Sequence, residues 1–366
     1  MTNQATLHST STLSPQAIVL WRIVQAIVWV IGMAIFICLI FFPKIGLIAL
    51  WNVLIPVAPA LLVVAGGLWR NVCPLATVNL LPRHLNCSKK KIMPAALHAK
   101  LQLAAVVALF VIVPLRHFIF NTNGMATAIL LLIATITGVW MGFVYDRKSG
   151  WCNSLCPVNP VERLYGSNTL FSFPNAHCDN CVNCSVPCPD STPNIHPSSS
   201  KKSVFNNYAG ILTIGGLPGF IWGYFQVPDF TVIKYQNLFE VYQMPLLGLF
   251  TTLFIYIILK EIFKKKNSRV LINIFAAAGV SCYYWFRIPA LFGFSKFAND
   301  VVLFNLKNII PGWRILLATV STTLFFCWWL IFRKPNHKSW VIRPPFAKGV
   351  KRNTISTIIP KAGGLM

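Results

Sequence analysis

The chain of 366 residues contains few acidic residues and few charged residues of any kind. Asp and Glu together number 8, charged residues make up 11% of the sequence, and hydrophobic residues make up 55%. Soluble globular domains carry about 25% charged residues, so this scarcity excludes an ordinary soluble enzyme. The high hydrophobicity also excludes a disordered chain. The composition therefore indicates an integral membrane protein.

Eight segments are apolar enough to cross a bilayer as helices, each of which needs about 20 residues. They cover residues 17–42, 45–67, 98–120, 125–145, 209–227, 244–263, 270–290 and 310–332. Glycines and a proline interrupt the fifth segment. The expected fold class is an all-α polytopic membrane protein with about eight transmembrane helices.

The basic residues are unevenly distributed among the segments that connect these spans. Of the 32 Lys and Arg residues, 24 fall in or beside the segments 68–97, 146–208, 264–269 and 333–366, and 7 fall on the other side. Loops rich in Lys and Arg stay in the cytoplasm, so these segments and both chain ends are expected there. The asymmetry accounts for most of the net charge of +24, and no nucleic-acid partner is needed to explain it.

The sequence has eleven cysteines, and eight of them lie in the two expected cytoplasmic segments 68–97 and 146–208. Cytoplasmic thiols stay reduced, so metal ligation explains these eight better than disulfides do. The other three, Cys38, Cys282 and Cys327, lie inside spans and are expected to pack as small apolar residues. The candidate ligands are Cys73, Cys87, Cys152, Cys156, Cys178, Cys181, Cys184 and Cys188.

Four of these cysteines form a C-x-x-C-x-x-C-x-x-x-C-P run from Cys178 to Pro189. This is the bacterial ferredoxin spacing for a [4Fe–4S] cluster, in which the fourth cysteine binds the other cluster of a pair. Zinc sites favour two separated C-x-x-C pairs, so zinc fits this run poorly. The run predicts a small ferredoxin-like [4Fe–4S] insertion in the cytoplasmic segment.

Two Cys-Pro loops suggest an internal repeat. Cys152 and Cys156 form a C-x-x-x-C-P motif after the fourth span, and Cys73 precedes a proline after the second span. When the loops are aligned on Cys-Pro, Trp69 stands where Cys152 stands in the second copy. Spans one and two therefore correspond to spans three and four, and the first copy has lost one cysteine.

These motifs resemble those of the membrane-bound polyferredoxins with C-x-x-x-C-P loops. That group includes the quinol-dehydrogenase subunit of periplasmic nitrate reductase systems, the membrane part of the nitrous-oxide reductase regulator, and an iron–sulfur protein that helps assemble cbb3-type oxidases. The resemblance covers about residues 17–200 and implies cytoplasmic [4Fe–4S] clusters in a bacterial inner membrane. This chain departs from the group because it has one ferredoxin run instead of two.

The sequence divides into five parts. They are a polar cytoplasmic N-terminus (1–16), a membrane repeat of two helical hairpins with a Cys-Pro loop at 67–87 (17–145), a cytoplasmic iron–sulfur domain (146–208), four further spans (209–332) and a basic cytoplasmic tail (333–366).

Two [4Fe–4S] clusters need eight thiolates, which matches the eight cytoplasmic cysteines, and one cluster is the minimum. Ferredoxin pairing assigns the first cluster to three cysteines of the run and one from the second loop, and gives the second cluster the other four. The first set is Cys178, Cys181, Cys184 and Cys156. The second set is Cys188, Cys152, Cys73 and Cys87.

Several polar residues lie in or beside the spans. Gln25, Asn52 and Gln102 are expected to form interhelical hydrogen bonds. His98 and His117 are expected to lie at opposite membrane interfaces, about 28 Å apart along one helix. The alternative for His117 is a quinone-headgroup site shared with Arg116.

The expected function is transfer of single electrons between a membrane quinone or redox protein and a reductase, as an electron-transfer subunit and not a complete enzyme. No residue qualifies as a general acid, base or nucleophile. Two alternatives remain: an iron–sulfur factor that assembles a membrane redox complex, and clusters that are structural or sense redox state. The expected partners are the lipid bilayer, a quinone and a redox protein.

Overall fold

The structure is a computed structural model of the whole chain. It describes residues 14–91, 93–145, 150–166, 169–171, 173–174, 176, 203–230, 235–263, 268–297, 302–333 and 341–342. These residues are almost entirely helical. A two-residue parallel pair, β1 (Phe173–Pro174) and β2 (Val341–Ile342), makes up the strands of the described part.

The helical elements follow one another along the chain, and several contain π-helical turns, labelled η. In order they are α1 (Pro15–Phe41), α2 (Pro43–Leu47), η1 (Ile48–Leu54), α3 (Ile55–Val72), α4 (Pro74–His84), α5 (Ala95–Ile112), η2 (Arg116–Phe120), α6 (Gly124–Val144), η4 (Trp151–Leu155), α7 (Val158–Tyr165), α8 (Val204–Ile211), η7 (Leu212–Gly216), α9 (Leu217–Tyr224), α10 (Tyr235–Ile262), α11 (Ser268–Leu291), α12 (Gly312–Cys327) and η9 (Trp328–Phe332).

Seven helices in the described residues are long and apolar enough to cross a membrane, instead of the eight expected. The segment at 209–227 is the one that does not qualify. It is helical through α8, η7 and α9, but Gly and Pro occupy four of its central positions. Its side chains face other helices, and Phe220 and Ile214 are buried there. The glycines fit this position, because helix contacts inside a membrane favour small residues.

The outer surface of the bundle is apolar, as a bilayer requires. In α1 only Gln25 and Leu39 are buried, while Leu20, Ile27 and Val30 each expose more than half of their surface. A soluble protein rarely exposes a continuous apolar face of this size. Together with the seven candidate spans, this surface supports an integral membrane protein.

Helix α3 is interrupted twice, and both interruptions connect distant parts of the chain. The hydroxyl of Tyr284 donates to Pro56 O (2.6 Å) and accepts from Ala60 N (2.8 Å), so it occupies the place of a ladder bond within α3. At Ala65 the backbone leaves helical geometry (φ −149°, ψ 56°). The carbonyl of Val64 there accepts from the backbone of Phe171 (2.9 Å). An inserted side chain and a broken ladder are recognised causes of helix kinks.

Close helix contacts depend on glycine at a few positions. A Cβ on Gly142 of α6 would lie 1.9 Å from the backbone oxygen of Asn79 in α4. Gly219 of α9 and Gly248 of α10 face each other in the same way. These contacts let α4 lie along α6 and α9 along α10.

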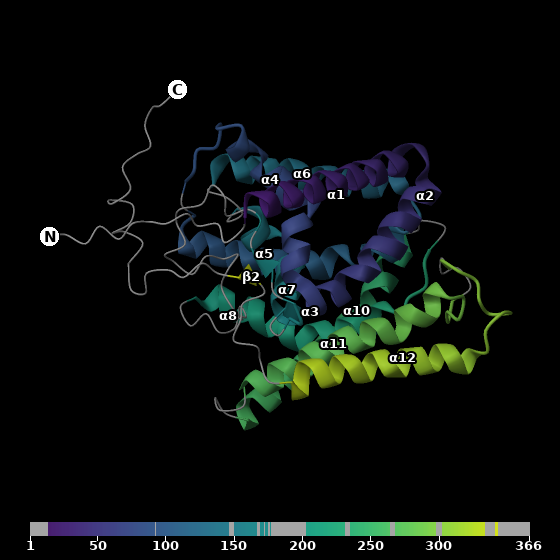
Figure 1. Cartoon of the computed structure of the whole chain (residues 1–366). Helices are drawn as coiled ribbons and strands as arrows, with labels where there is room; N and C mark the ends of the chain where they lie inside the picture. The colour runs from purple at the N-terminus through teal and green to yellow at the C-terminus, as the bar shows by residue number, and fades with distance from the viewer. Residues whose placement is uncertain are drawn as a thin grey trace.

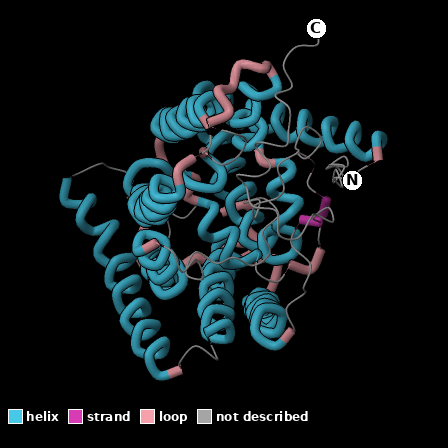
Figure 2. The backbone as a smooth tube through the Cα atoms, turned by 90° about the vertical axis from the view of Figure 1, so that its left-hand side faces the viewer, coloured by secondary structure: helices cyan, strands magenta, loops and turns pink. Residues whose placement is uncertain are grey.

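The bundle has two distinct ends (Figure 1). We call the end that carries Cys73, Cys152 and Cys156 the cysteine end; β2 lies there, on the left of Figure 1. We call the opposite end, marked by α2 on the right, the cavity end. Figure 2 looks along the bundle, with several helices seen end-on and the short strands at its edge. Which end faces the cytoplasm stays a prediction from the basic residues.

Candidate functional site

Both Cys-Pro loops turn the chain from one helix into the next. Cys73 lies between α3 and α4, and Cys156 lies between η4 and α7. Each cysteine has an extended backbone ψ near 120°, and the proline that follows opens the next helical turn. Proline favours this position because it lacks the N–H that a first turn leaves unbonded. The sequence thus fixes each thiol at the same kind of helix junction.

The structure brings Cys73 and Cys156 close together. Burial, together with a smaller effect of the neighbouring Cys73, raises the pKa of the Cys156 thiol to about 12. The thiol is therefore protonated at neutral pH unless a cation replaces the proton, as happens when a thiolate binds a metal. The two helix junctions thus bring two sulfur atoms near each other.

A buried polar network holds the two loops to each other. Arg70, three residues before Cys73, donates through Nε to Glu162 Oε1 (2.8 Å) and through Nη2 to Asn153 Oδ1 (2.8 Å). Arg70 and Glu162 expose only 5% and 4% of their surface. Buried charges persist when they are paired and hydrogen-bonded, and this pair fixes the first loop to α7 behind the second loop.

The expected interhelical hydrogen bonds are confirmed, and two of them end on the loops. Gln25 of α1 donates to the carbonyl of Asn71 (2.9 Å), and Gln102 of α5 donates to the carbonyl of Asn153 (3.2 Å). In each hairpin, a glutamine of the first helix therefore supports the loop that follows the second helix. This correspondence agrees with the internal repeat inferred from the sequence.

The segment that leads into the ferredoxin run is attached to the first loop. The backbone N–H of Ala176 donates to Asn71 Oδ1 (3.1 Å), and Trp21 of α1 contacts Phe173 edge-to-face. The four run cysteines, Cys178, Cys181, Cys184 and Cys188, lie outside the described residues, as does most of the expected ferredoxin-like insertion.

Of two further candidate cysteines, one lies beside α4 and the other lies beyond its end. The thiol of Cys152 is 3.9 Å from Asn79 Oδ1 in the middle of α4. Cys87 is exposed beyond the end of α4, and its thiol donates to Pro82 O (3.2 Å). The eleven residues of α4, about 16 Å long, separate Cys87 from Cys73. Among the described residues, no three His, Cys, Asp or Glu side chains converge as a metal site.

A cavity of about 380 Å³ lies at the other end of the bundle. His117 and Asp229 form an ion pair at its wall, with 2.6 Å between Nδ1 and Oδ1, and Asn121 donates to the same carboxylate oxygen (2.7 Å). The cavity is lined by Lys44, Leu47, Ile48, Trp51, Asn52, Arg116, His117, Asn121, Thr122, Tyr224, Phe225, Val227, Asp229, Arg287, Ala290 and Phe297.

His117 is buried (5% exposed) and bonded to Asp229 and to the carbonyl of Tyr224 (3.0 Å), in the wall of a cavity that Arg116 also lines. Its position at a membrane interface stays a prediction. Asp229 could not be foreseen as its partner, because it lies 112 positions further along the chain. His98, in the first turns of α5 at the cysteine end, has no such carboxylate partner in the described residues.

The comparisons with known proteins give one partial likeness. No family model and no solved structure matches the chain. The ferredoxin-type protein NapH of Haemophilus influenzae is 31% identical over 93 residues, which are 24% of this chain and 29% of NapH. The match thus spans less than a third of that relative. It supports a NapH-like relationship over this part of the chain and leaves the rest without a counterpart.

Proposed function

We propose that this protein is a membrane-bound iron–sulfur electron-transfer protein. The ferredoxin run would supply Cys178, Cys181 and Cys184 to a [4Fe–4S] cluster, and Cys156 would complete it. A bound cluster supplies reversible one-electron transfer. The residues of this chain hold it in place, shield it and provide the surface where a partner docks.

One observation carries this proposal: Ala176 is hydrogen-bonded to Asn71. Cys178 is two positions beyond Ala176, a reach of about 7 Å, and Cys73 is two positions beyond Asn71. This attachment supports a cluster shared between the run and the loops, since the Cys73 thiol neighbours Cys156. The donor set also fits, since half-buried thiols without a disulfide partner are soft ligands suited to iron–sulfur clusters.

The second ligand set needs revision. The sequence grouped Cys73 and Cys87 with Cys152 and Cys188, but α4 keeps Cys73 and Cys87 apart. We therefore propose Cys73, Cys152 and Cys188 as ligands of any second cluster and leave Cys87 out. A second cluster would then need a fourth ligand other than Cys87.

The finer parts of the proposal concern partners and sidedness. A membrane quinone or a redox protein would exchange electrons with the clusters, and a reductase would stand at the other end of the transfer. The basic segments around the cysteine end place it in the cytoplasm by the positive-inside rule. The partial likeness to a ferredoxin-type protein supports the iron–sulfur role. No observation favours the assembly-factor alternative.

The test measures iron and acid-labile sulfide per chain, on full-length protein purified anaerobically in detergent. We expect about eight of each for two clusters or about four for one. Cys156→Ala should lower both counts by about four, while Cys87→Ala and the matched control Cys327→Ala, inside a span, should leave them unchanged. Zinc without sulfide, or iron unaffected by Cys156→Ala, would contradict the proposal.

A further inference from the structure

The cavity end carries more positive charge than its own carboxylate can balance. Lys44, Arg116 and Arg287 all line the cavity, and Asp229 is the acidic residue among the described lining residues. Asp229 is already held by His117 and Asn121. Even without Arg287, the two cations Lys44 and Arg116 outnumber this carboxylate, so the described lining keeps a net positive charge, which a bound anion would neutralise.

Arg116 is the most telling of these cations. It is 8% exposed, and its Nε donates to Asn121 Oδ1 (3.2 Å). Its guanidinium lies 4.2 Å from the ring centre of Trp51 and 5.5 Å from that of Tyr224. In the described part of the chain, no carboxylate lies within ion-pair distance of it. A charge removed from water without a counter-ion is costly, so the site is incomplete without an anion.

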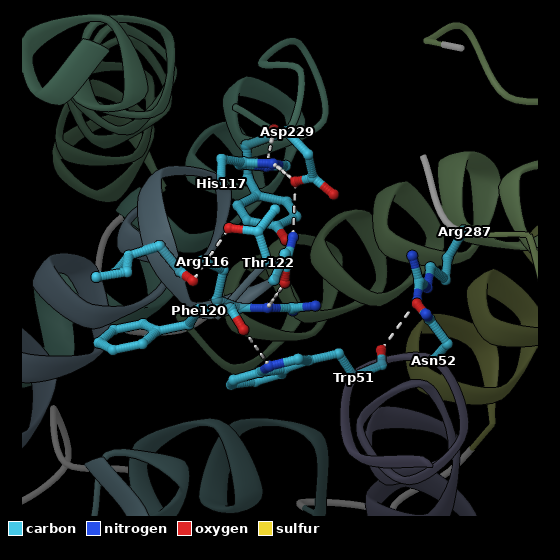
Figure 3. A network of polar contacts seen from close by, with 11 residues as sticks. Trp51, Asn52, Arg116, His117, Phe120, Thr122, Asp229 and Arg287 are labelled. Carbon is cyan, nitrogen blue, oxygen red and sulfur yellow. Dashed lines mark hydrogen bonds and ion pairs between the residues drawn. The ribbon is translucent and has the colours of Figure 1, made fainter. Parts of the chain in front are cut away.

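Trp51 connects the two arginines. Figure 3 shows the Trp51 ring beside Arg116, and the backbone end of the same residue near Arg287 and Asn52. Arg287 donates through Nη2 to Trp51 O (2.9 Å) and to Asn52 Oδ1. Guanidinium groups bind phosphate oxygens through paired hydrogen bonds. A neutral ligand such as a quinone would leave the excess charge of Lys44 and Arg116 over Asp229 unbalanced, so the charge balance favours an oxyanion.

The position of the cavity suggests what carries the anion. Lys44 follows the end of α1, Arg116 follows α5, and Arg287 lies near the end of α11. Ends of membrane helices lie where the headgroups begin. The volume of about 380 Å³ falls in the range of small-molecule sites, about 300–1,000 Å³, and exceeds what one inorganic ion needs.

We propose that this cavity binds a phosphate group, carried by the headgroup of an anionic phospholipid or by a free organic phosphate. The aromatic walls then contact the apolar part of the ligand, and Arg116, Arg287 and Lys44 face its oxygens. This binding is separate from electron transfer. Protein that lacks its clusters, such as Cys156→Ala, should bind the phosphate as well as the unaltered protein does.

The experiment uses the full chain in detergent and measures binding by native mass spectrometry and by ligand-induced thermal stabilisation. The probes are phosphatidylglycerol, glycerol 3-phosphate, zwitterionic phosphatidylcholine and a short-chain ubiquinone. We expect phosphatidylglycerol to bind and phosphatidylcholine to bind far more weakly. Binding of glycerol 3-phosphate as well would show that the phosphate suffices without the acyl chains, and its failure would identify the lipid as the ligand.

Charge variants test the residues. Arg116→Gln should weaken phosphatidylglycerol binding about 10- to 100-fold, the range for losing a charged hydrogen-bond donor. Lys44→Gln changes an exposed side chain that folding does not need, and should weaken binding several-fold. Lys307→Gln is the control, because Lys307 is exposed at the same end and does not line the cavity. Equal binding by all three variants, or binding of the quinone alone, would overturn the proposal.

Discussion

The two ends of the bundle each bury an arginine, and they treat it differently. Arg70 at the cysteine end is 5% exposed and bonds to Glu162 and Asn153. Arg116 at the cavity end is 8% exposed and bonds to Asn121 and two aromatic rings. The first arginine has a direct carboxylate partner, and the second has none among the described residues.

This difference separates an architectural charge from a binding charge. A buried arginine with a carboxylate partner fixes two segments together and leaves little for a ligand to gain. A buried arginine without a carboxylate partner can still form its strongest charge interaction, which is the one with a bound anion. The degree of internal neutralisation therefore indicates where to look for a ligand, even when both side chains are equally buried.

The largest expected effect comes from breaking the neutralised pair. Arg70→Met should destabilise the protein by about 3–5 kcal/mol, because it leaves Glu162 as an uncompensated buried charge. The double variant Arg70→Met/Glu162→Met should recover most of that loss. Chemical unfolding in detergent, followed by circular dichroism, measures both. A double variant as unstable as the single variant would show that the loss in Arg70→Met does not come from an unpaired charge on Glu162.

A smaller change in the unfolding free energy is expected at the cavity end, where the buried arginine has no direct carboxylate partner among the described residues. Without a phosphate ligand, Arg116→Met should change the unfolding free energy by no more than about 1 kcal/mol or should stabilise the protein, since it removes a buried charge that lacks a counter-ion. With phosphatidylglycerol added, only the unaltered protein should gain stability. A loss as large as that of Arg70→Met would erase the contrast between the two ends.

The smallest effect is a dependence on pH at the cavity end. Burial opposes ionisation of Asp229, but the hydrogen bonds and charge of His117, with Asn121 and Arg116, outweigh it and hold the pKa of Asp229 below its ordinary value. The ionised carboxylate thus adds stability above its ordinary pKa of about 3.9, and this stability is lost as the pH falls through the lower folded value.

Thermal midpoints from pH 6 to pH 3 check this expectation. Unaltered protein should lose stability over the acid part of the range, and Asp229→Asn should lose less. Parallel curves for the two proteins would show that Asp229 is not stabilised in its ionised form.

The sequence predicted the features that follow from local composition. Long apolar stretches identified seven of the spans, and polar residues within them identified the bonds of Gln25 and Gln102. The segment at 209–227 is not among the seven candidate spans, because glycines that allow close packing between helices lower its mean hydropathy. Composition records how apolar a segment is and does not record what the segment faces.

Contacts between distant residues could not be predicted. Nothing in the sequence pairs Glu162 with Arg70, which lies 92 positions away. Arg116 and His117 were recognised as a pair, but Asp229 and Arg287 join them through tertiary packing alone. The separation of Cys87 from Cys73 also needed the structure. The same number of residues could have formed a loop that folds back and brings the two thiols together, but here they form the helix α4.

The bond between Arg70 and Asn153 has a consequence for how the two hairpins could have diverged. When the loops are aligned on their Cys-Pro pairs, these two residues occupy the same position in each copy, and in the fold they meet at 2.8 Å. A duplicated ancestor with arginine at that position would have set two like charges against each other. Arginine in one loop and asparagine in the other avoid that repulsion, so this contact between the two loops depends on unlike residues at matching positions.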